Sequence, residues 1–355
     1  MATTRKSVTK ASPARKVASR SPRSRRPEPP PKKRPVVLHE ISARAFEHPA
    51  EAAALAALRR VPGFDFVLKR LFALVGDRAL RVAFQGSAVR VSPHQFPEVW
   101  AEYVKAAQIL DMSPLPELFV AQTPFVNAGA VGLAKPLIVL NSGSLDLFDG
   151  DELRYILGHE LGHVLGQRVL YKTMLRVILR ISQAAFSVPL GGAALFAISA
   201  ALLEWDRKSE LSADRAGLLA VQDVDVAYRA QMKMAGGGRT NEMNLAAFAE
   251  QAREYEAGGS VLDSVWKLIQ LSGTTHPFPV IRLAELRKWA ESGAYDAIVS
   301  GDYPRRADDK AEPSFVDEVK KTAGSYKESF ETSGDPLVSF VRGMVAEVKR
   351  RAGGS

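Results

Sequence analysis

The amino-acid sequence predicts a mainly helical α+β fold with a small mixed sheet, and three observations carry this prediction. Apolar residues recur at helical spacing over most of residues 36–303. Two short apolar runs, residues 116–120 and 136–140, have the length and composition of strands. The chain of 355 residues contains no cysteine, which excludes a disulfide framework, thiol chemistry and cysteine-ligated metals. We therefore expect packed helices beside a small sheet.

The first 34 residues differ from the rest of the chain in charge. They contain twelve Lys or Arg residues and one acid, a net charge of +11, whereas residues 35–355 carry −2. Few large apolar residues accompany these charges, so we expect a disordered basic tail over residues 1–35. Such a tail either solubilises the protein or attracts anionic lipid headgroups or nucleic acid by charge alone. Specific nucleic-acid binding is not expected, because no aromatic residue lies among the basic ones.

The segment after the tail is predicted to contain helices and strands. Residues 50–60 and 64–75 have the apolar spacing of amphipathic helices. Residues 80–91 are predicted as a pair of strands with a turn at residues 86–87. Residues 97–110 are predicted as a further helix, which begins at a proline.

Between the two apolar strand candidates lies a segment of small residues, 127–132. Small side chains on an edge strand leave backbone N–H and C=O groups accessible, so an extended peptide can pair with them. A protein can in this way hold peptides with little preference for their side chains. Asn127 begins the segment and is either a turn residue or part of a binding site.

Residues 157–166 carry two histidines and a glutamate at a spacing that suits a metal ion. On a helix, His159 and His163 are four residues apart and project from one face, so both can hold one ion. Zinc binds neutral imidazole, and catalytic zinc sites keep one position open for water. Glu160 lies one position round the helix, where it can take a proton from that water.

A catalytic zinc site needs a third protein ligand, and a second predicted helix offers one. A third histidine soon after the first motif is excluded, because Val169 stands at the position that it would take. Glu210 and Asp214 are four residues apart and share a helix face. Glu210 can bind the ion while Asp214 accepts a hydrogen bond from the free ring nitrogen of a ligand histidine. A solvated acidic face is the alternative, and the first motif argues against it.

These motifs resemble those of a known group of zinc peptidases. The His-Glu-x-x-His pattern at 159–163, followed by Glu-x-x-x-Asp at 210–214, is similar to the gluzincin metallopeptidases of the HtpX and CAAX prenyl protease type. The resemblance covers about residues 115–290. It includes Asn-Ala-Gly-Ala at 127–130 and Thr-His-Pro at 275–277, after which Arg282 follows.

The resemblance implies a zincin-type endopeptidase that binds one Zn²⁺ ion per chain. It assigns the metal ligands His159, His163 and Glu210, the general base Glu160, and Asp214 as the hydrogen-bond partner of a ligand. His276 lies in a loop that resembles one near the active site of relatives. There it would stabilise an oxyanion or occupy the open zinc position in a latent state, unless it is an ordinary surface residue.

Residues 181–203 form a run of 23 residues without a charge, which is long enough to span a membrane. His163 and Glu210 flank this run and must meet at one ion, so any crossings between them must be even in number. Two spans need roughly 40 apolar residues, whereas residues 171–204 supply 34, with three basic residues among them. We therefore predict a helical hairpin over about residues 172–204. Its apolar tip either packs on the domain or dips into one membrane leaflet.

The remaining part of the chain is predicted as helices and a linker. Residues 224–234 and 244–257 are predicted helices, and residues 282–293 are predicted as the last helix of the domain. Prolines and polar residues after residue 303 indicate a linker. Residues 337–348 carry an apolar stripe followed by basic residues, so this helix either docks on the domain or lies on an anionic membrane.

The sequence thus predicts a basic tail (1–35), a zinc metallopeptidase domain (36–303), and a linker with an amphipathic helix (304–355). We expect the protein to hydrolyse peptide bonds of protein substrates, in protein quality control at or near a membrane. The alternative is a noncatalytic zinc-containing protein that holds unfolded or membrane-associated clients, and the base Glu160 argues against it. The tail lacks the apolar run of a secretory signal, so we expect a cytoplasmic location, with or without peripheral attachment to an anionic membrane.

Overall fold

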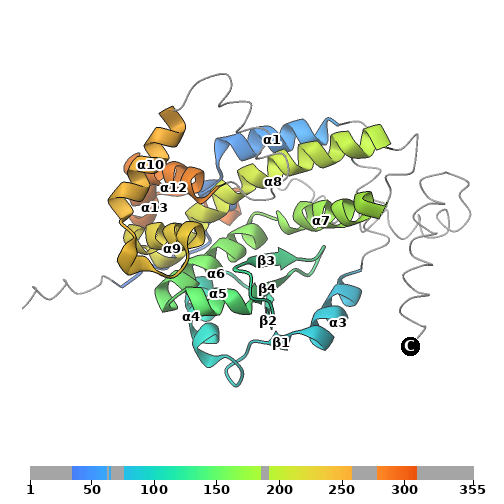
Figure 1. Cartoon of the computed structure of the whole chain (residues 1–355), viewed down its shortest axis with the longest axis horizontal. Coiled ribbons are helices and arrows are strands. Elements are labelled where there is room, and N and C mark those ends of the chain that lie inside the picture. The colour runs from blue at the N-terminus through green and yellow to red at the C-terminus, as the bar shows by residue number, and fades with distance from the viewer. Residues whose placement is uncertain (1–33, 62–63, 65–75, 185–191, 258–277, 310–355) are drawn as a thin grey trace, which may run out of the picture. The chain divides into compact units, whose positions relative to one another are not determined.

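The computed structural model describes residues 34–61, 64, 76–184, 192–257 and 278–309 (Figure 1). This part of the chain is mainly helical and contains a four-stranded sheet, which confirms the predicted fold class. Several predictions concern segments outside the described residues. These are most of the basic tail, most of the predicted helix at 64–75, the tip of the hairpin, the loop with His276, and the C-terminal helix.

The sheet has the strand order β1-β2-β4-β3 and is mixed, as predicted. Its central strands, β2 (Glu117–Ala121) and β4 (Leu137–Asn141), are parallel. The strands β1 (Val89–Arg90) and β3 (Ala128–Val131) pair antiparallel to them at the two edges. The two predicted apolar strands are therefore confirmed, and the small residues between them form the edge strand β3.

The segment predicted as a pair of strands, residues 80–91, folds mostly as helix α3 (Asp77–Ser87), so this prediction is wrong. Its partly buried residues Leu80 and Phe84 are four apart, which is the spacing of a helix, and Phe84 packs against β2. The carboxylate of Asp77 accepts hydrogen bonds from three backbone N–H groups in the turn between β3 and β4. The Gly-Ser pair that suggested a turn lies in the last turn of α3.

Helices α4 (Pro97–Ile109) and α6 (Gly150–Leu165) pack against each other. The first confirms a predicted helix, and the second carries the His-Glu-x-x-His motif. The chain reaches α6 from β4 through the short helix α5 (Ser142–Leu147). A capping box starts α6, because the Asp149 carboxylate accepts the N–H of Glu152 and the Glu152 carboxylate accepts the N–H of Asp149. The start of the motif helix is therefore fixed by local hydrogen bonds.

The region predicted as a helical hairpin contains α7 (Val169–Ala184) and α8 (Gly192–Val221), which pack against each other. Helix α8 continues through the second motif, so Glu210 and the hairpin region share one helix. Helix α1 (Pro49–Arg59), a confirmed prediction, lies along α8 (Figure 1). Within the described ranges, every helix is too short or too polar to cross a membrane.

The chain continues through α9 (Val224–Gly236) and α10 (Leu245–Ala257), which confirm two predicted helices. Helix α12 (Pro279–Glu291) follows, but it is not the last helix of the domain as predicted, because α13 (Ala294–Val299) comes after it. Gly293 separates the two with φ +83°, a left-handed conformation that glycine adopts without strain.

Short 3-10 turns complete the described chain: η1 (Ala43–Ala45), η2 (Thr240–Glu242) and η3 (Arg306–Asp308). The first and last of these lie near a β-bridge between Ile41 and Arg305. The beginning and the end of the described chain are therefore joined by backbone hydrogen bonds.

Two apolar clusters stabilise these elements. The main core gathers side chains from the sheet, α4, α6, α9 and the C-terminal half of α8. A second cluster, here called the hairpin core, lies between α1, α7 and the N-terminal half of α8. Its buried members are Leu58, Phe64, Leu170, Tyr171, Met174, Leu175, Ile178, Ile198, Leu202 and Trp205. Helix α8 runs through both clusters, so it links the motif helix α6 to the hairpin region.

Candidate metal centre

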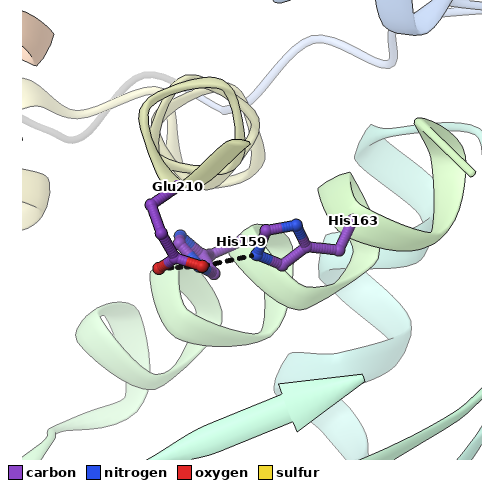
Figure 2. A group of neighbouring side chains, drawn as sticks. All are labelled: His159, His163 and Glu210. Carbon is purple, nitrogen blue, oxygen red and sulfur yellow. Dashed lines mark ion pairs between the residues drawn. The ribbon is translucent and has the colours of Figure 1, made fainter. Parts of the chain in front are cut away.

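The three predicted metal ligands meet in the structure. His159 and His163 project from one face of α6, and Glu210 reaches them from α8 (Figure 2). One ligand atom from each residue lies within 4.8 Å of the other two. Glu210 Oε2 lies 3.4 Å from His159 Nε2, and Glu210 Oε1 lies 3.2 Å from His163 Nε2. All three side chains are buried, so the group is shielded from bulk water.

Glycines and alanines bring α6 and α8 close enough for these ligands to meet. A Cβ atom on Gly158 would lie 2.3 Å from the Cβ of Ala220, and one on Gly162 would lie 2.4 Å from the Cβ of Ala216. Both separations are far below van der Waals contact, so no larger side chain fits at the helix spacing seen here. Two glycines of the motif segment therefore serve packing rather than chemistry.

Asp214 fixes the orientation of the His159 ring. The two side chains share a hydrogen bond of 3.0 Å, in which Nδ1–H of His159 donates to Oδ1 of Asp214, so Nε2 points toward Glu210. The spacing of the second motif predicted this contact. Burial by itself lowers the pKa of His159, but Glu210 and Asp214 raise it to about 9. A metal ion at Nε2 would compete with that proton.

Asp214 is held in turn by a buried network. Arg282 of α12 donates from Nε to Oδ2 at 2.8 Å and from Nη2 to Oδ1 at 2.5 Å. Tyr155 Oη and Gln231 Nε2 also donate to Oδ1, at 2.8 Å and 3.0 Å. Burial disfavours the charged carboxylate, but the Arg282 guanidinium outweighs it and lowers the pKa of Asp214 to about 2. Asp214 therefore stays ionised and can hold the ligand ring.

Sequence reasoning missed this network. Arg282 was part of the resemblance, but no role was assigned to it, although a guanidinium is the usual bidentate partner of a buried carboxylate. Tyr155 lies on α6, and Gln231 lies on α9. Both read as ordinary helix residues, and neither position carries a sequence signal for its partner.

Glu160 lies on α6 next to the ligands and faces the edge strand β3. Its Oε2 accepts a hydrogen bond of 2.8 Å from the backbone N–H of Ala130, and its Oε1 lies 4.0 Å from His159 Nε2. The side chain is buried, at 6% exposure. A group that can exchange protons therefore stands between the ligand group and an edge of the sheet.

Lys172 of α7 is a second residue that sequence reasoning missed, since it counted only as an obstacle to a membrane span. Its Nζ donates to Glu210 Oε1 at 2.6 Å and to Asp206 Oδ1 at 2.7 Å. Asp206 lies one turn before Glu210 on α8. Burial lowers the pKa of Lys172, but the two carboxylates outweigh it and raise the pKa, so the ammonium keeps its charge. A lysine within a largely apolar segment is the one hint in the sequence.

The ligand group has the chemistry of a catalytic zinc site. Burial lowers the pKa of His163 well below its ordinary value, which favours the neutral ring that metals bind. Both ring nitrogens of His163 are buried, and neither has a hydrogen bond within the described part of the chain. Two imidazoles and one carboxylate leave a fourth tetrahedral position open, as in zinc hydrolases. The residues therefore fit such an ion.

The two weaker candidates have different outcomes. Asn127 precedes β3 with an exposed side chain, and its backbone N–H and C=O are bonded to the Ser144 hydroxyl at 3.0 Å and 2.9 Å. These are contacts of its backbone, so the role of the Asn127 side chain stays a prediction. His276 lies outside the described residues.

Comparisons with known proteins agree with the site. Residues 93–290 match the sequence model of peptidase family M48. The protein named plastoglobule-localized metallopeptidase 48, chloroplastic, from Arabidopsis thaliana is 32% identical over 271 residues, which are 75% of this chain and 78% of the relative. No solved structure gave a significant match.

The family and the relative confirm the resemblance to the HtpX and CAAX prenyl protease type, and with it the zincin-type fold. They also establish a metal-dependent protease that acts on proteins or peptides. The match covers more than half of the chain and includes both metal motifs. The chain therefore belongs to peptidase family M48 and is a metallopeptidase.

Proposed function

We propose that the protein is a zinc endopeptidase in which His159, His163 and Glu210 hold one Zn²⁺ ion and Glu160 is the general base. The observation that supports this most directly is the convergence of the three ligands within 4.8 Å. Asp214 positions His159 through the hydrogen bond at Nδ1. Glu160 stands beside this group without being one of the ligands.

A bound zinc ion supplies a Lewis acid for the scissile carbonyl and lowers the pKa of water. Glu160 takes a proton from the attacking water as the new C–O bond forms. The same carboxyl group then gives that proton to the amine nitrogen as the C–N bond breaks. The hydrogen bond from Ala130 keeps the carboxylate at the edge of β3, beside the position of the peptide.

The substrate would lie in extended form along β3. This strand is at the edge of the sheet and consists of small residues, so only side chains bond to its outward backbone groups, and a peptide that displaces side chains can pair there. Main-chain hydrogen bonds of this kind hold many sequences, which suits an endopeptidase that acts on unfolded protein.

Replacement of the base tests the mechanism. Glu160→Gln should lower casein hydrolysis by at least roughly a hundredfold, because the amide cannot accept the proton, while the zinc content stays at one ion per chain. The matched control is Glu254→Gln, which changes an exposed glutamate of α10 in the same way and should leave activity unchanged. Undiminished activity of Glu160→Gln would refute the assignment.

The identity of the metal needs its own experiment. The purified protein should contain one zinc ion per chain by elemental analysis, and a chelator should remove both the ion and the activity. Zn²⁺ should restore activity at lower free concentration than Mg²⁺ or Ca²⁺, because the latter prefer oxygen ligands. Recovery with Mg²⁺ alone would contradict a zinc site.

The cellular role and the domain limits are also proposals. The relative is named as plastoglobule-localised, and the chain carries a basic tail of charge +11, so we place the protein in quality control at a membrane surface. The parts would be the tail (1–35), the peptidase domain (36–303) with its hairpin (172–204), and the linker with its helix (304–355). Cell fractionation tests this. Release from membranes by salt indicates attachment through the tail, and resistance to carbonate indicates the hairpin.

A further inference from the structure

The outward side of β3 carries backbone groups that do not pair with β4. In an antiparallel pair, every second residue of a strand turns its N–H and C=O away from its partner. On β3 the outward residue nearest the metal centre is Ala130, and Gly132 follows two positions later. An extended peptide on this edge would donate to the carbonyl oxygen of Ala130, whose N–H is bonded to Glu160, and would offer a donor and an acceptor to Gly132.

Side chains of α7 already occupy three of these four groups, and the fourth, the N–H of Ala130, is bonded to Glu160. Arg176 Nη1 donates to the carbonyl oxygen of Ala130 at 2.7 Å. The Thr173 hydroxyl accepts from the N–H of Gly132 and donates to its carbonyl oxygen, both at 3.0 Å. The hydroxyl thus matches the donor and the acceptor that a peptide unit would present. Arg176 also fills the space beside Gly129, where a Cβ atom would lie 2.8 Å from Nη2.

The same face of α7 reaches the metal ligands. Lys172, Thr173 and Arg176 are at positions i, i+1 and i+4, so they share one side of the helix. Lys172 binds Glu210 on α8, while Arg176 binds Ala130 of β3 and Thr173 binds Gly132, the residue after this strand. One helix therefore contacts a metal ligand and the strand edge next to the base Glu160.

The packing of α7 differs from that of the elements it covers. Most of its buried apolar residues, among them Leu170 and Met174, belong to the hairpin core with α1 and the N-terminal half of α8, and only Val169, at its beginning, belongs to the main core. The motif helix α6 and strand β3 belong to the main core. Few apolar contacts would therefore have to break inside the main core if α7 moved away from β3.

We propose that α7 is an intramolecular competitor of the peptide substrate, whose Thr173 and Arg176 must leave the outward edge of β3 before a peptide binds there. This inference rests on the proposed function, because it takes β3 as the strand that pairs with substrate. The apparent affinity for peptides is then the affinity of the open form multiplied by the fraction of molecules in which the edge of β3 is open.

A single introduced thiol can report this movement, because the chain contains no cysteine. Thr173→Cys is placed in a Glu160→Gln background with zinc bound and is reacted with a maleimide, with and without an unstructured casein peptide. Thr173 is 2% exposed, so the thiol should react slowly while α7 lies on β3. Saturating peptide should accelerate the reaction about tenfold or more. The control is Ala227→Cys in α9, where the exposure is 0% and no acceleration is expected.

The outcomes of this experiment separate the inference from the proposed function. Peptide that binds, as measured by fluorescence polarisation, and leaves the thiol of Thr173→Cys protected would refute competition by α7 while leaving the peptidase assignment intact. Equal acceleration of both thiols would indicate general loosening and would also refute it. If no peptide binds and the unmodified protein does not hydrolyse casein, both the inference about α7 and the proposed function are refuted.

Kinetics provide a second test that needs no buried substitution. Arg176→Ala removes the hydrogen bond to Ala130 and favours the open edge, so KM for an unstructured peptide should fall about two- to tenfold with kcat unchanged. The matched control is Arg90→Ala on β1, at the opposite edge of the same sheet, which should change neither constant. A higher KM for Arg176→Ala would show that Arg176 binds the substrate itself and would overturn the proposal.

Discussion

The two sides of the metal centre are built differently. On one side, Asp214, Arg282 and Tyr155 form a buried hydrogen-bond network on helices that pack in or against the main core. On the other side, Lys172 reaches Glu210 from α7, whose apolar face belongs to the hairpin core. The first side orients His159 through several elements at once, whereas the second side depends on one helix. From this difference we expect the ligands to keep their arrangement if α7 moves as proposed above.

The largest loss of stability is expected on the side of the main core. Arg282→Met leaves Asp214 buried beside an apolar side chain, so the free energy of unfolding of the metal-free protein should fall by about 3–5 kcal/mol. Urea unfolding followed by circular dichroism measures this loss. Arg287→Met, on the same helix and in a more exposed pair with Glu291, is the control and should cost less than about 1 kcal/mol. Equal losses for the two variants would contradict the comparison.

A smaller loss, which depends on the metal, is expected on the α7 side. Lys172→Met removes the ammonium between Asp206 and Glu210 and should lower the free energy of unfolding of the metal-free protein by about 2–3 kcal/mol. With zinc bound the loss should be smaller, because the ion offsets the charge of Glu210. Parallel urea titrations with zinc and with a chelator measure both values. The same loss of stability in both conditions would show that the contribution of Lys172 does not depend on the metal ion.

The close approach of α6 and α8 is expected to matter somewhat less for stability, by about 1–3 kcal/mol. Gly162→Ala places a methyl group against Ala216, so it should force the helices apart and also weaken zinc binding. Gly162→Ala combined with Ala216→Gly should recover part of both losses. Gly86→Ala in α3, where nothing lies within 4 Å of the added methyl group, is the control and should be neutral or slightly stabilising, because alanine favours a helix more than glycine does. If the losses of the two single variants simply add in the double variant, the contact between residues 162 and 216 does not set the spacing of α6 and α8.

The smallest effect is expected outside the ligand group, in the partly exposed pair of Glu285 and His48. Hydrogen bonds from His48 and Lys288 lower the pKa of Glu285 from 4.5 to about 2. The folded pKa is below the unfolded value, so the ionised group stabilises the fold above about pH 4.5, and this contribution is lost as the pH falls toward 2. Glu285→Gln should flatten the decline of stability over this pH window, and Glu254→Gln should not. Identical pH profiles would refute the assignment.

Much of the fold could be predicted, because its signals are local. The spacing of apolar residues gave α4, α9 and α10 nearly to their ends, and the two proline-led apolar runs gave β2 and β4. Helix α3 was predicted as strands because a Gly-Ser pair suggested a turn. What decides its conformation is distant, namely the packing of Phe84 on β2 and the bonds of Asp77 to the β3–β4 turn.

In the candidate site too, contacts within one helix could be predicted and contacts between helices could not. His159, His163, Glu210 and Asp214 could be predicted because each pair occupies neighbouring positions on one helix, where a spacing of four carries the geometry. Lys172 and Arg282 lie on other helices, and their contacts depend on how α7 and α12 pack. No spacing within the sequence records such a contact, so only the folded chain reveals it.

The methyl-to-glycine contacts between α6 and α8 have a consequence for how an ion enters the centre. They set the distance between the two imidazoles and the carboxylate through apolar packing, in which an ion takes no part. An incoming ion then meets a preorganised cage and orders few further torsions, so little conformational entropy opposes its capture. We therefore expect a chelator to remove the ion, and added ion to return, while the chain stays folded.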